Sequence, residues 1–266
     1  MAQADQLVLE ARGVTLQYKT PQHLVTATYR VDLEVFEGDR FVILGPSGCG
    51  KSTLLKAIGG FMAPIEGDIF LRGRKVVKPG PDRMMVFQEF EQLMPWKTAL
   101  GNVLFPMHAT GRFKGKEARE RALSVLSKVG LSKFANSYPH MLSGGMKMRV
   151  AIARAMAMEP DILLMDEPFA ALDALTRRRM QEDLLELWDQ LRFTVLFVTH
   201  SIEEAILVGS RILVLSPHPG RVRAELNSSY VHGQPVDDAS FGLLSKRIHK
   251  LVFEGETEAA KPGVHA

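Results

Sequence analysis

The sequence predicts an α/β fold with a mostly parallel core sheet, an N-terminal antiparallel β subdomain and an inserted helical subdomain. Short apolar runs have the pattern of strands buried on both faces, and they lie at 40–45, 161–168, 194–200 and 211–216. Helical segments alternate with such runs, as in parallel sheets, and they lie at 143–158, 174–191 and 202–208. Residues 7–18 and 27–39 instead alternate apolar with polar side chains, which is typical of half-buried antiparallel strands.

The domain organisation follows from the placement of these segments. With 266 residues, 46% of them hydrophobic, the chain is long enough to bury a large core. Residues 1–226 are predicted to form the main domain, and the inserted stretch of about 89–158 contains no convincing strand. Residues 227–266 form a polar tail without a domain of its own, in which the amphipathic stretch 241–253 is expected to add a helix.

Composition excludes several classes of protein. The net charge of +3 and the pI near 9.0 come from basic residues that are spread along the chain, so a dedicated nucleic-acid surface is not indicated. Cys49 is the single cysteine, which rules out an internal disulfide and favours a reducing compartment. Residues 1–13 lack the apolar core of a secretion signal. No run approaches the roughly 20 apolar residues of a membrane span, so we expect a chain that does not cross a membrane.

The strongest chemical motif is GPSGCGKST, which follows a predicted buried strand and opens a predicted helix. This is the context that a phosphate-binding loop requires. Its glycines let backbone N–H groups surround phosphate oxygens, Lys51 supplies a cation to the β- and γ-phosphates, and Ser52 supplies a hydroxyl to Mg²⁺. The residues assigned to the nucleotide here are Gly45, Pro46, Ser47, Gly48, Cys49, Gly50, Lys51, Ser52 and Thr53. Cys49 occupies a variable position, where a small residue that fits is the plain interpretation.

A second motif, ILLMDEP, places two carboxylates at the end of a predicted buried strand. Ligands of parallel sheets collect at the carboxyl ends of the strands. Asp166 is therefore a candidate to hold Mg²⁺, directly or through water. Glu167 follows at once and is the candidate to position or deprotonate an attacking water.

Three single residues also lie near predicted strand ends. His200 follows a buried run and could hydrogen-bond a γ-phosphate, although a lone histidine is more often structural. Gln88 follows the short apolar run MMVF, and its side-chain carbonyl could ligate Mg²⁺ or water. Tyr18, placed at the end of the second N-terminal strand, could stack on an adenine ring; an exposed strand-end tyrosine is the plain alternative.

The stretch MLSGGM begins a second predicted anion site, almost a hundred residues after the first. Ser143 is a good N-cap for the helix that follows, and the glycines leave backbone N–H groups uncovered. Such a helix end attracts negative charge through its free N–H groups and its dipole. The sequence therefore presents two phosphate-binding helix ends in one domain.

In this order and at this spacing, the phosphate loop, Gln88, LSGGM, ILLMDEP, ALD and His200 resemble the ATP-binding cassette (ABC) family of transport ATPases. The resemblance covers roughly residues 7–225. It implies a P-loop NTPase cassette that binds ATP and Mg²⁺ and hydrolyses ATP. By this resemblance Lys51 holds the β/γ-phosphates, and Ser52, Gln88 and Asp166 surround Mg²⁺. Glu167 is the general base, His200 holds the γ-phosphate and Tyr18 stacks on the adenine.

The resemblance also offers a reason for two phosphate sites. Two cassettes of this family pack head to tail, with each ATP between the phosphate loop of one subunit and the LSGG helix end of the other. Ser143, Gly144 and Gly145 would then meet the γ-phosphate held by a second subunit, and Asp173 in ALD would lie on the same interface. The implied partner is a second ATPase subunit, most simply an identical one.

This sequence departs from the common family pattern after LSGG. Met146 stands where glutamine is usual, and Lys147 and Met148 replace the common Gln/Arg pair. Neither the backbone donors nor Ser143 depends on these side chains, so we expect activity to survive.

Further motifs resemble the cassettes of nitrate, sulfonate and taurine importers. They are LMPWKTALGNV, DEPFAALDALTR, THSIEEAI and LSPHPGRV. This likeness implies uptake of a small anionic solute through an integral-membrane permease, with a solute-binding protein as an indirect partner. It also implies a position on the cytoplasmic face of the membrane. Trp96 falls in the region expected to contact the permease, with plain packing as the alternative.

The sequence disfavours two other functions. Soluble cassette ATPases of DNA repair, chromosome maintenance or translation usually have long coiled coils, zinc motifs or two cassettes. Here about ninety residues separate the phosphate loop from LSGG, and there is one cysteine and one cassette. A nucleotide-binding regulator without hydrolysis is disfavoured because Glu167 and His200 are both present.

Overall fold

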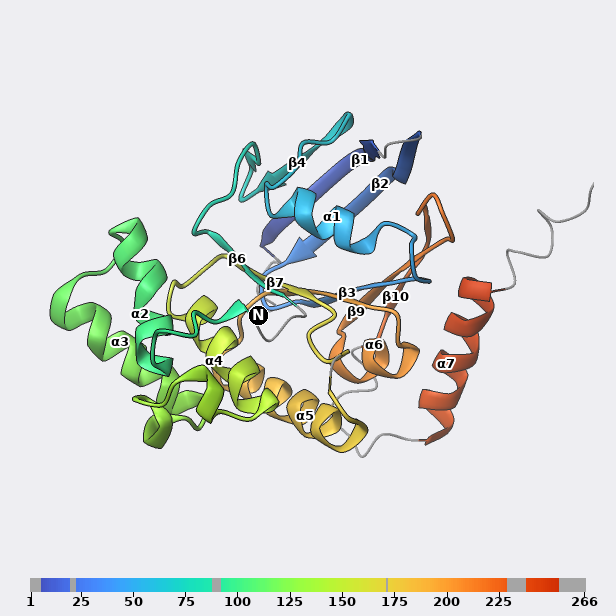
Figure 1. Cartoon of the computed structure of the whole chain (residues 1–266). Helices are drawn as coiled ribbons and strands as arrows, with labels where there is room; N and C mark the ends of the chain where they lie inside the picture. Colours follow the sequence, from blue (N-terminus) through green and yellow to red (C-terminus); the bar gives the residue numbers. More distant parts are fainter. Residues whose placement is uncertain (1–5, 20–22, 88–91, 171, 229–237, 254–266) are drawn as a thin grey trace, which may run out of the picture. The chain divides into compact units, whose positions relative to one another are not determined.

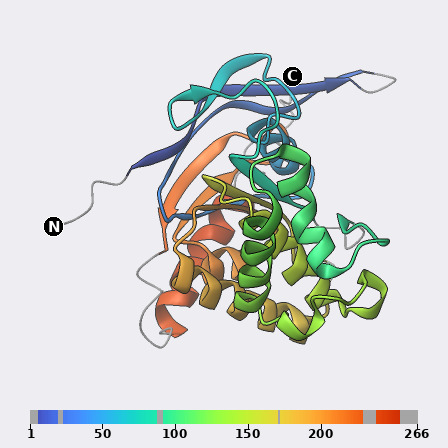
Figure 2. The ribbon, with the colours of Figure 1, turned by 90° about the vertical axis from the view of Figure 1, so that its left-hand side faces the viewer.

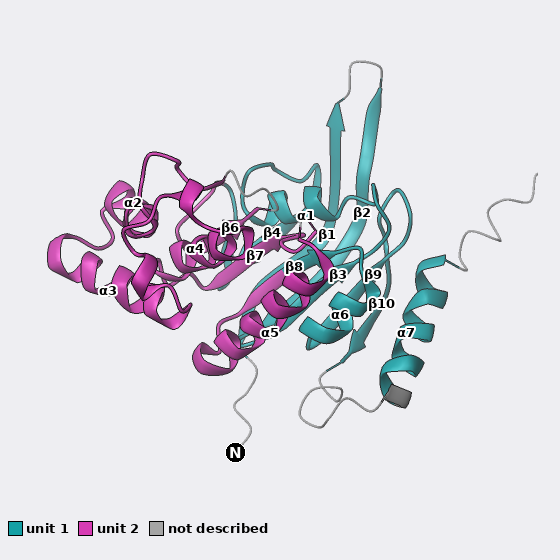
Figure 3. Ribbon diagram, turned by 60° about the horizontal axis from the view of Figure 1, so that its bottom comes forward, with its two compact units in different colours: residues 1–77, 197–266 teal, residues 78–196 magenta. Residues whose placement is uncertain are grey.

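The computed structural model describes residues 6–19, 23–87, 92–170, 172–228 and 238–253. The chain divides into two compact units (Figure 3). Unit 1 combines residues 1–77 with residues 197–266, and unit 2 consists of residues 78–196. One boundary falls between Val77 and Lys78, and the other falls within strand β8 (Val195–Thr199).

Unit 1 contains a four-stranded antiparallel sheet in the order β2-β1-β4-β5. Its strands are β1 (Leu7–Lys19), β2 (Leu24–Phe36), β4 (Glu66–Leu71) and β5 (Arg74–Lys75). In Figure 2 the long strands β1 and β2 run side by side (blue), as their antiparallel pairing from Leu7–Phe36 to Lys19–Leu24 requires. The alternation of the sequence places one set of apolar side chains inside, among them Leu9, Val14 and Leu16.

The rest of unit 1 is built around strand β3 (Arg40–Leu44), all five residues of which are buried. β3 pairs in parallel with β9 (Arg211–Leu215), and β9 pairs antiparallel with β10 (Val222–Asn227). The helices of this unit are α1 (Lys51–Ile58), α6 (Ile202–Val208) and α7 (Asp238–Phe253) (Figure 1).

Helix α7 packs against α6 and β9 through a buried apolar stripe of Leu244, Ile248 and Val252. Arg223 of β10 donates a hydrogen bond from Nη1 to the carbonyl oxygen of Leu251 (3.1 Å), which joins the strand to the last turn of the helix. The amphipathic stretch 241–253 is therefore helical, and its apolar side is covered by unit 1.

Unit 2 contains a parallel pair of strands and a group of helices. β6 (Arg83–Val86) pairs in parallel with β7 (Ile162–Asp166). The helices are α2 (Ala99–Thr110), α3 (Gly115–Lys128), α4 (Gly144–Met156) and α5 (Ala174–Leu191), with 3₁₀ turns at Ser132–Phe134 and Pro139–Met141. α2 packs on both α3 and α4. No helix of the described chain has the length and apolar character needed to cross a membrane.

The predicted α/β class is confirmed, and each of the four buried apolar runs contains a strand. Within residues 92–158, all of which are described, no strand occurs, as expected for the helical insertion. The placement of Tyr18 was wrong, because it lies in the first strand, β1, one residue before its end.

Candidate functional site

The phosphate loop of unit 1 joins the buried strand β3 directly to helix α1. Gly48 and Gly50 adopt left-handed backbone angles, with φ of 80° and 95°. A β-carbon on Gly50 would also lie 2.5 Å from the carbonyl oxygen of Ala27, so only glycine fits there. The loop can therefore turn tightly and leave its backbone N–H groups facing outward.

Lys51 is 4% exposed, and two loop carbonyls hold its ammonium group. Nζ donates to the carbonyl oxygens of Gly45 (2.8 Å) and Pro46 (3.0 Å). The long side chain thus folds back over the loop rather than into solvent, and this arrangement keeps a cation where a phosphate on the loop would meet it.

Helix α1 begins with no side-chain cap and no acidic residue in its first turn. Its first N–H groups and the positive end of its dipole are therefore not offset by a local carboxylate. Ser52 and Thr53 are half-buried in this first turn, and Cys49 is buried beneath it. The end of α1 has the electrostatics of an anion site.

The turn from β9 to β10 lies against the same loop. Gly220 donates its N–H to the carbonyl oxygen of Ala27 and accepts from the N–H of Tyr29, both at 2.9 Å. A β-carbon on Gly220 would collide with the carbonyl oxygen of Cys49. The β9–β10 turn and the phosphate loop are thus in direct backbone contact.

His200 follows β8 and is exposed in unit 1. Hydrogen bonds of Thr199 and Ser201 fix the backbone on both sides of it. Thr199 Oγ1 donates to Glu204 Oε2 (2.6 Å) and accepts from the N–H of Ser201 (3.0 Å), and Ser201 Oγ caps α6 by accepting from the N–H of Glu204. The imidazole therefore extends from a rigid turn. Tyr18 is 44% exposed, at the far end of β1.

In unit 2, Asp166 ends β7 and is half-buried after four buried residues. Glu167 follows with φ of 44°, an unfavourable angle for a residue with a side chain. Strained backbone of this kind persists at functional sites, where the surroundings hold it in place. The turn is closed by a hydrogen bond from the N–H of Ala170 to the carbonyl oxygen of Glu167 (3.1 Å).

Ser143 and Asp173 cap two neighbouring helices of unit 2. Ser143 Oγ accepts from the N–H of Met146 (3.3 Å) at the start of α4, and Asp173 Oδ1 accepts from the N–H of Thr176 (3.0 Å) at the start of α5. The hydrogen bonds from Thr176 lower the pKa of Asp173. Both helix starts are exposed at their caps.

The starts of α4 and α5 pack together. A β-carbon on Gly145 would meet Met180 Sδ at 3.4 Å and Thr176 Cγ2 at 3.6 Å, and Arg149 forms an ion pair with Asp183 further along the two helices. Unit 2 thus brings Ser143, Gly144 and Gly145 close to Asp173. Gln88 lies outside the described residues.

The sequence-based prediction missed Gln92 and Arg154. Gln92 Nε2 donates to the carbonyl oxygen of Phe87 (2.7 Å), and Arg154 of α4 donates to the backbone oxygen (2.7 Å) and Oε1 (3.0 Å) of Gln92. Burial lowers the pKa of Arg154. These contacts join Phe87 and α4 through Gln92. In the sequence, the one sign of this contact was an arginine, Arg154, among the apolar residues of α4.

The predicted site residues therefore form two groups, one in each unit. Unit 1 holds the phosphate loop with Lys51 and Ser52, together with His200 and Tyr18. Unit 2 holds Asp166 and Glu167 on β7 and the capped helix starts with Ser143 to Gly145 and Asp173. Among the residues described, no cluster of three or more histidine, cysteine or acidic side chains could hold a metal by itself.

Comparison with known proteins gives consistent matches. The ABC transporter family model matches residues 29–170. The chain is 52% identical over 207 residues to the taurine import ATP-binding protein TauB of Rhizobium johnstonii, covering 78% of both chains. It is 43% identical over 213 residues to the bicarbonate transport ATP-binding protein CmpD of Synechocystis, covering 79% of this chain and 75% of the relative.

Solved cassettes have the same fold. The dimeric post-hydrolysis state of the ATP-binding cassette MJ0796, bound to ADP and Pi, matches with a TM-score of 0.69 and 37% identity. The match covers 83% of this chain and 98% of that one.

Proposed function

The chain belongs to the ABC transporter family and is an ATPase, and we propose that it energises the uptake of a small anionic solute through a membrane permease. Relatives named for taurine import and for bicarbonate transport support an importer. Taurine carries a sulfonate group and bicarbonate is an anion. A small solute with an anionic group, of the nitrate, sulfonate or taurine type, is therefore consistent with both relatives. The single observation behind the proposal is the 52% identity to a taurine import ATPase over 78% of both chains.

Nucleotide binding is assigned to the phosphate loop. Its backbone N–H groups and the uncapped start of α1 bind the phosphates, and Lys51 neutralises charge on the β- and γ-phosphates. Tyr18 is the candidate to stack on the adenine. The carbonyl oxygens of Gly45 and Pro46 already hold the Lys51 ammonium group beside the loop before phosphate binds.

The residues present fit a magnesium ion. Ser52 offers a hydroxyl in the half-buried first turn of α1, and Asp166 offers a half-buried carboxylate at the end of β7. Mg²⁺ prefers oxygen ligands and usually combines one or two protein groups with water and substrate phosphates. When bound, the ion would offset the negative charge of the phosphate groups. Gln88 is proposed as a further ligand.

Hydrolysis is assigned to Glu167 and His200. The carboxylate of Glu167 orients an attacking water and accepts its proton, and the strained turn after β7 fixes the direction of that carboxylate. His200 donates a hydrogen bond to the γ-phosphate from its rigid turn. Positioning and charge neutralisation supply most of the catalysis in phosphoryl transfer.

Two copies of the chain are proposed to pack head to tail. The start of α4, with Ser143, Gly144 and Gly145, then binds the γ-phosphate held by the other copy, and Asp173 lies at the same interface. Hydrolysis removes this ligand, so the pair closes with ATP and opens afterwards. The dimeric MJ0796 cassette, at 37% identity, supports the formation of a dimer.

The permease is proposed to contact unit 2 near Trp96, on the cytoplasmic face of the membrane. Trp96 is 73% exposed, which is unusual for a tryptophan. Asn102 fixes the loop beneath it by accepting from the N–H of Met94 (2.8 Å) and donating to the carbonyl oxygen of Lys97 (3.1 Å). A rigidly held exposed aromatic is suited to anchor a protein contact. A solute-binding protein is the indirect partner.

The proposal is tested by capture from detergent-solubilised membranes of the host. Tagged Glu167→Gln protein, which retains ATP without hydrolysing it, is expected to bring down one multi-span permease and a solute-binding protein when ATP is present. The matched control is Glu167→Gln with Trp96→Ala, which should retain ATP and recover less permease. If only soluble or nucleic-acid-associated proteins are recovered, the transport assignment fails and the ATPase assignment stands.

A further inference from the structure

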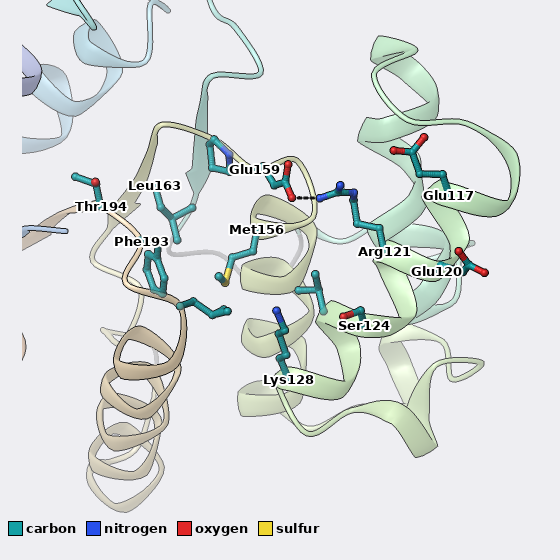
Figure 4. Close-up of a pocket in the computed structure, with 13 residues that line it drawn as sticks. Glu117, Glu120, Arg121, Ser124, Lys128, Met156, Glu159, Leu163, Phe193 and Thr194 are labelled. Carbon is teal, nitrogen blue, oxygen red and sulfur yellow. Dashed lines mark hydrogen bonds and ion pairs between the residues drawn. The ribbon is translucent and has the colours of Figure 1, made fainter. Parts of the chain in front are cut away.

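Unit 2 contains a cavity of about 710 Å³ that none of the predicted nucleotide residues lines. It lies between one face of α3, the end of α4, the start of β7 and the connection from α5 to β8 (Figure 4). Cavities of this size are in the range of drug-sized ligand sites. We propose that it is a binding site for a small anionic amphiphile, an apolar body with one carboxylate or sulfonate group.

The apolar body is assigned from the walls of the cavity. Met156, Leu163 and Phe193 lie near one another (Figure 4), and Val125 of α3 also lines the cavity. Val125 and Leu163 are buried, and the ring of Phe193 is half-exposed, so it offers an aromatic surface to a ligand. Walls that are mostly apolar with a few polar groups are typical of small-molecule sites.

The charge preference is assigned from α3. Arg121 and Lys128 lie seven residues apart, two turns or about 10 Å along the helix, so both project from the face that lines the cavity. In Figure 4 the Lys128 side chain extends from α3 toward the middle of the cavity.

Three carboxylates also line the cavity, and each is already compensated. Glu159 forms an ion pair with Arg121, which Figure 4 marks with a dashed line. Glu120 Oε1 lies 3.6 Å from Nζ of Lys116, which is on the preceding turn of the helix. Glu117 is in the first turn of α3, where the helix dipole favours a negative charge.

Lys128, by contrast, has no carboxylate within ion-pair distance in the described parts of the chain, and it lies in the last turn of α3. Lys128 is therefore the lining charge that, among the residues described, is left without a partner, and the anionic group of the ligand is assigned to it.

The test uses the fluorescent probe 8-anilinonaphthalene-1-sulfonate, an aromatic body with one sulfonate, and its neutral analogue N-phenyl-1-naphthylamine. Binding is titrated with saturating Mg-ATP, so that the nucleotide site is filled. The sulfonate is expected to bind with a stoichiometry of one. Displacement by ATP, or binding of many probe molecules per chain, would overturn the proposal.

Two matched pairs of variants on α3 locate the probe. Ser124→Phe fills the cavity and should weaken both probes by about tenfold or more, whereas Ser127→Phe, outside the cavity, should not. Lys128→Glu should weaken the sulfonate by about tenfold and leave the neutral analogue unchanged, whereas Arg119→Glu, outside the cavity, should change neither. Lys128 and Arg119 are both exposed, so these variants test the site even if Ser124→Phe fails to fold. Equal effects within either pair would overturn the assignment.

Discussion

Individual residues set the shape of the phosphate loop, and two of its glycines show how differently they do so. Gly48 and Gly50 both have left-handed backbone angles. A β-carbon on Gly48 would meet no atom within 4 Å, whereas one on Gly50 would lie 2.5 Å from the carbonyl oxygen of Ala27. Gly48 is thus required by backbone angle alone, and Gly50 by both angle and space.

Gly50→Ala is therefore expected to cost more stability than Gly48→Ala. The left-handed angle costs alanine about 1–2 kcal/mol at either position. At Gly50 the contact with backbone adds about 1–3 kcal/mol, because a backbone carbonyl cannot rotate away as a side chain can. Urea denaturation of both variants measures the difference, and equal losses would contradict the steric argument.

At the scale of elements, the cap of α5 makes stability depend on pH. Thr176 hydrogen-bonds lower the pKa of Asp173 below its usual value of 3.8. A lowered pKa in the folded state means that the carboxylate stabilises the protein above the unfolded pKa, and that this contribution is lost as the pH falls through the folded pKa.

Asp173→Asn keeps a capping side chain that does not titrate. The stability advantage of the wild type over this variant should be present at pH 6 and shrink as the pH is lowered below about 4. Urea denaturation across this range gives the comparison. An advantage that stays constant, or grows on acidification, would show that the carboxylate does not cap α5.

Helix α7 offers a second test at this scale, because adjacent leucines face opposite ways. Leu244 is 4% exposed and Leu243 is 70% exposed. Leu244→Ala should lower the free energy of unfolding by about 2–4 kcal/mol, and Leu243→Ala should change it by less than about 0.5 kcal/mol. If both are neutral by thermal and urea denaturation, α7 is not an integral part of unit 1.

Strands with a continuous apolar run could be predicted from the sequence, and strands of mixed composition could not. The runs at β3, β7, β8 and β9 are continuously apolar, so burial on both faces was evident from the sequence. β4 and β5 are short, with exposed charged residues, and are stabilised by pairing with β1 or with each other. β10 alternates valine, alanine and leucine with charged residues, but its pairing with β9 depends on a contact that no local pattern shows.

The candidate site divides in the same way. The phosphate loop and the caps at Ser143 and Asp173 depend on local sequence, and the structure has these loop and cap geometries. The contact of Arg154 with Gln92 joins residues 62 apart in the chain, and it depends on packing that the sequence does not display.

At the scale of the whole molecule, the site residues fall into two groups and one of them is proposed to act on a second copy. Lys51→Met should remove the cation that holds the β- and γ-phosphates on the phosphate loop of the same chain. Ser143→Arg should stop the start of α4 from binding the γ-phosphate held by the other copy. Each variant alone is expected to lack ATPase activity. The isolated Ser143→Arg chain should still bind ATP.

A mixture of the two variants tests the arrangement. In a head-to-tail pair of one of each, one site combines an intact phosphate loop with an intact α4 start, so activity should return to at most about a quarter of the wild-type level. Steady-state ATPase assays of the separate and mixed proteins measure this. If the mixture stays inactive although mixed dimers form, Ser143 does not act on the other copy's nucleotide.

The backbone contact between Gly220 and Cys49 has a consequence for control of the protein. It lies in the turn before β10, and β10 is tied to α7 through Arg223. A molecule that displaces α7 would therefore disturb the loop that is proposed to bind the phosphates. Such a molecule would alter how tightly the loop holds ATP and, through Lys51, how fast bound ATP is hydrolysed.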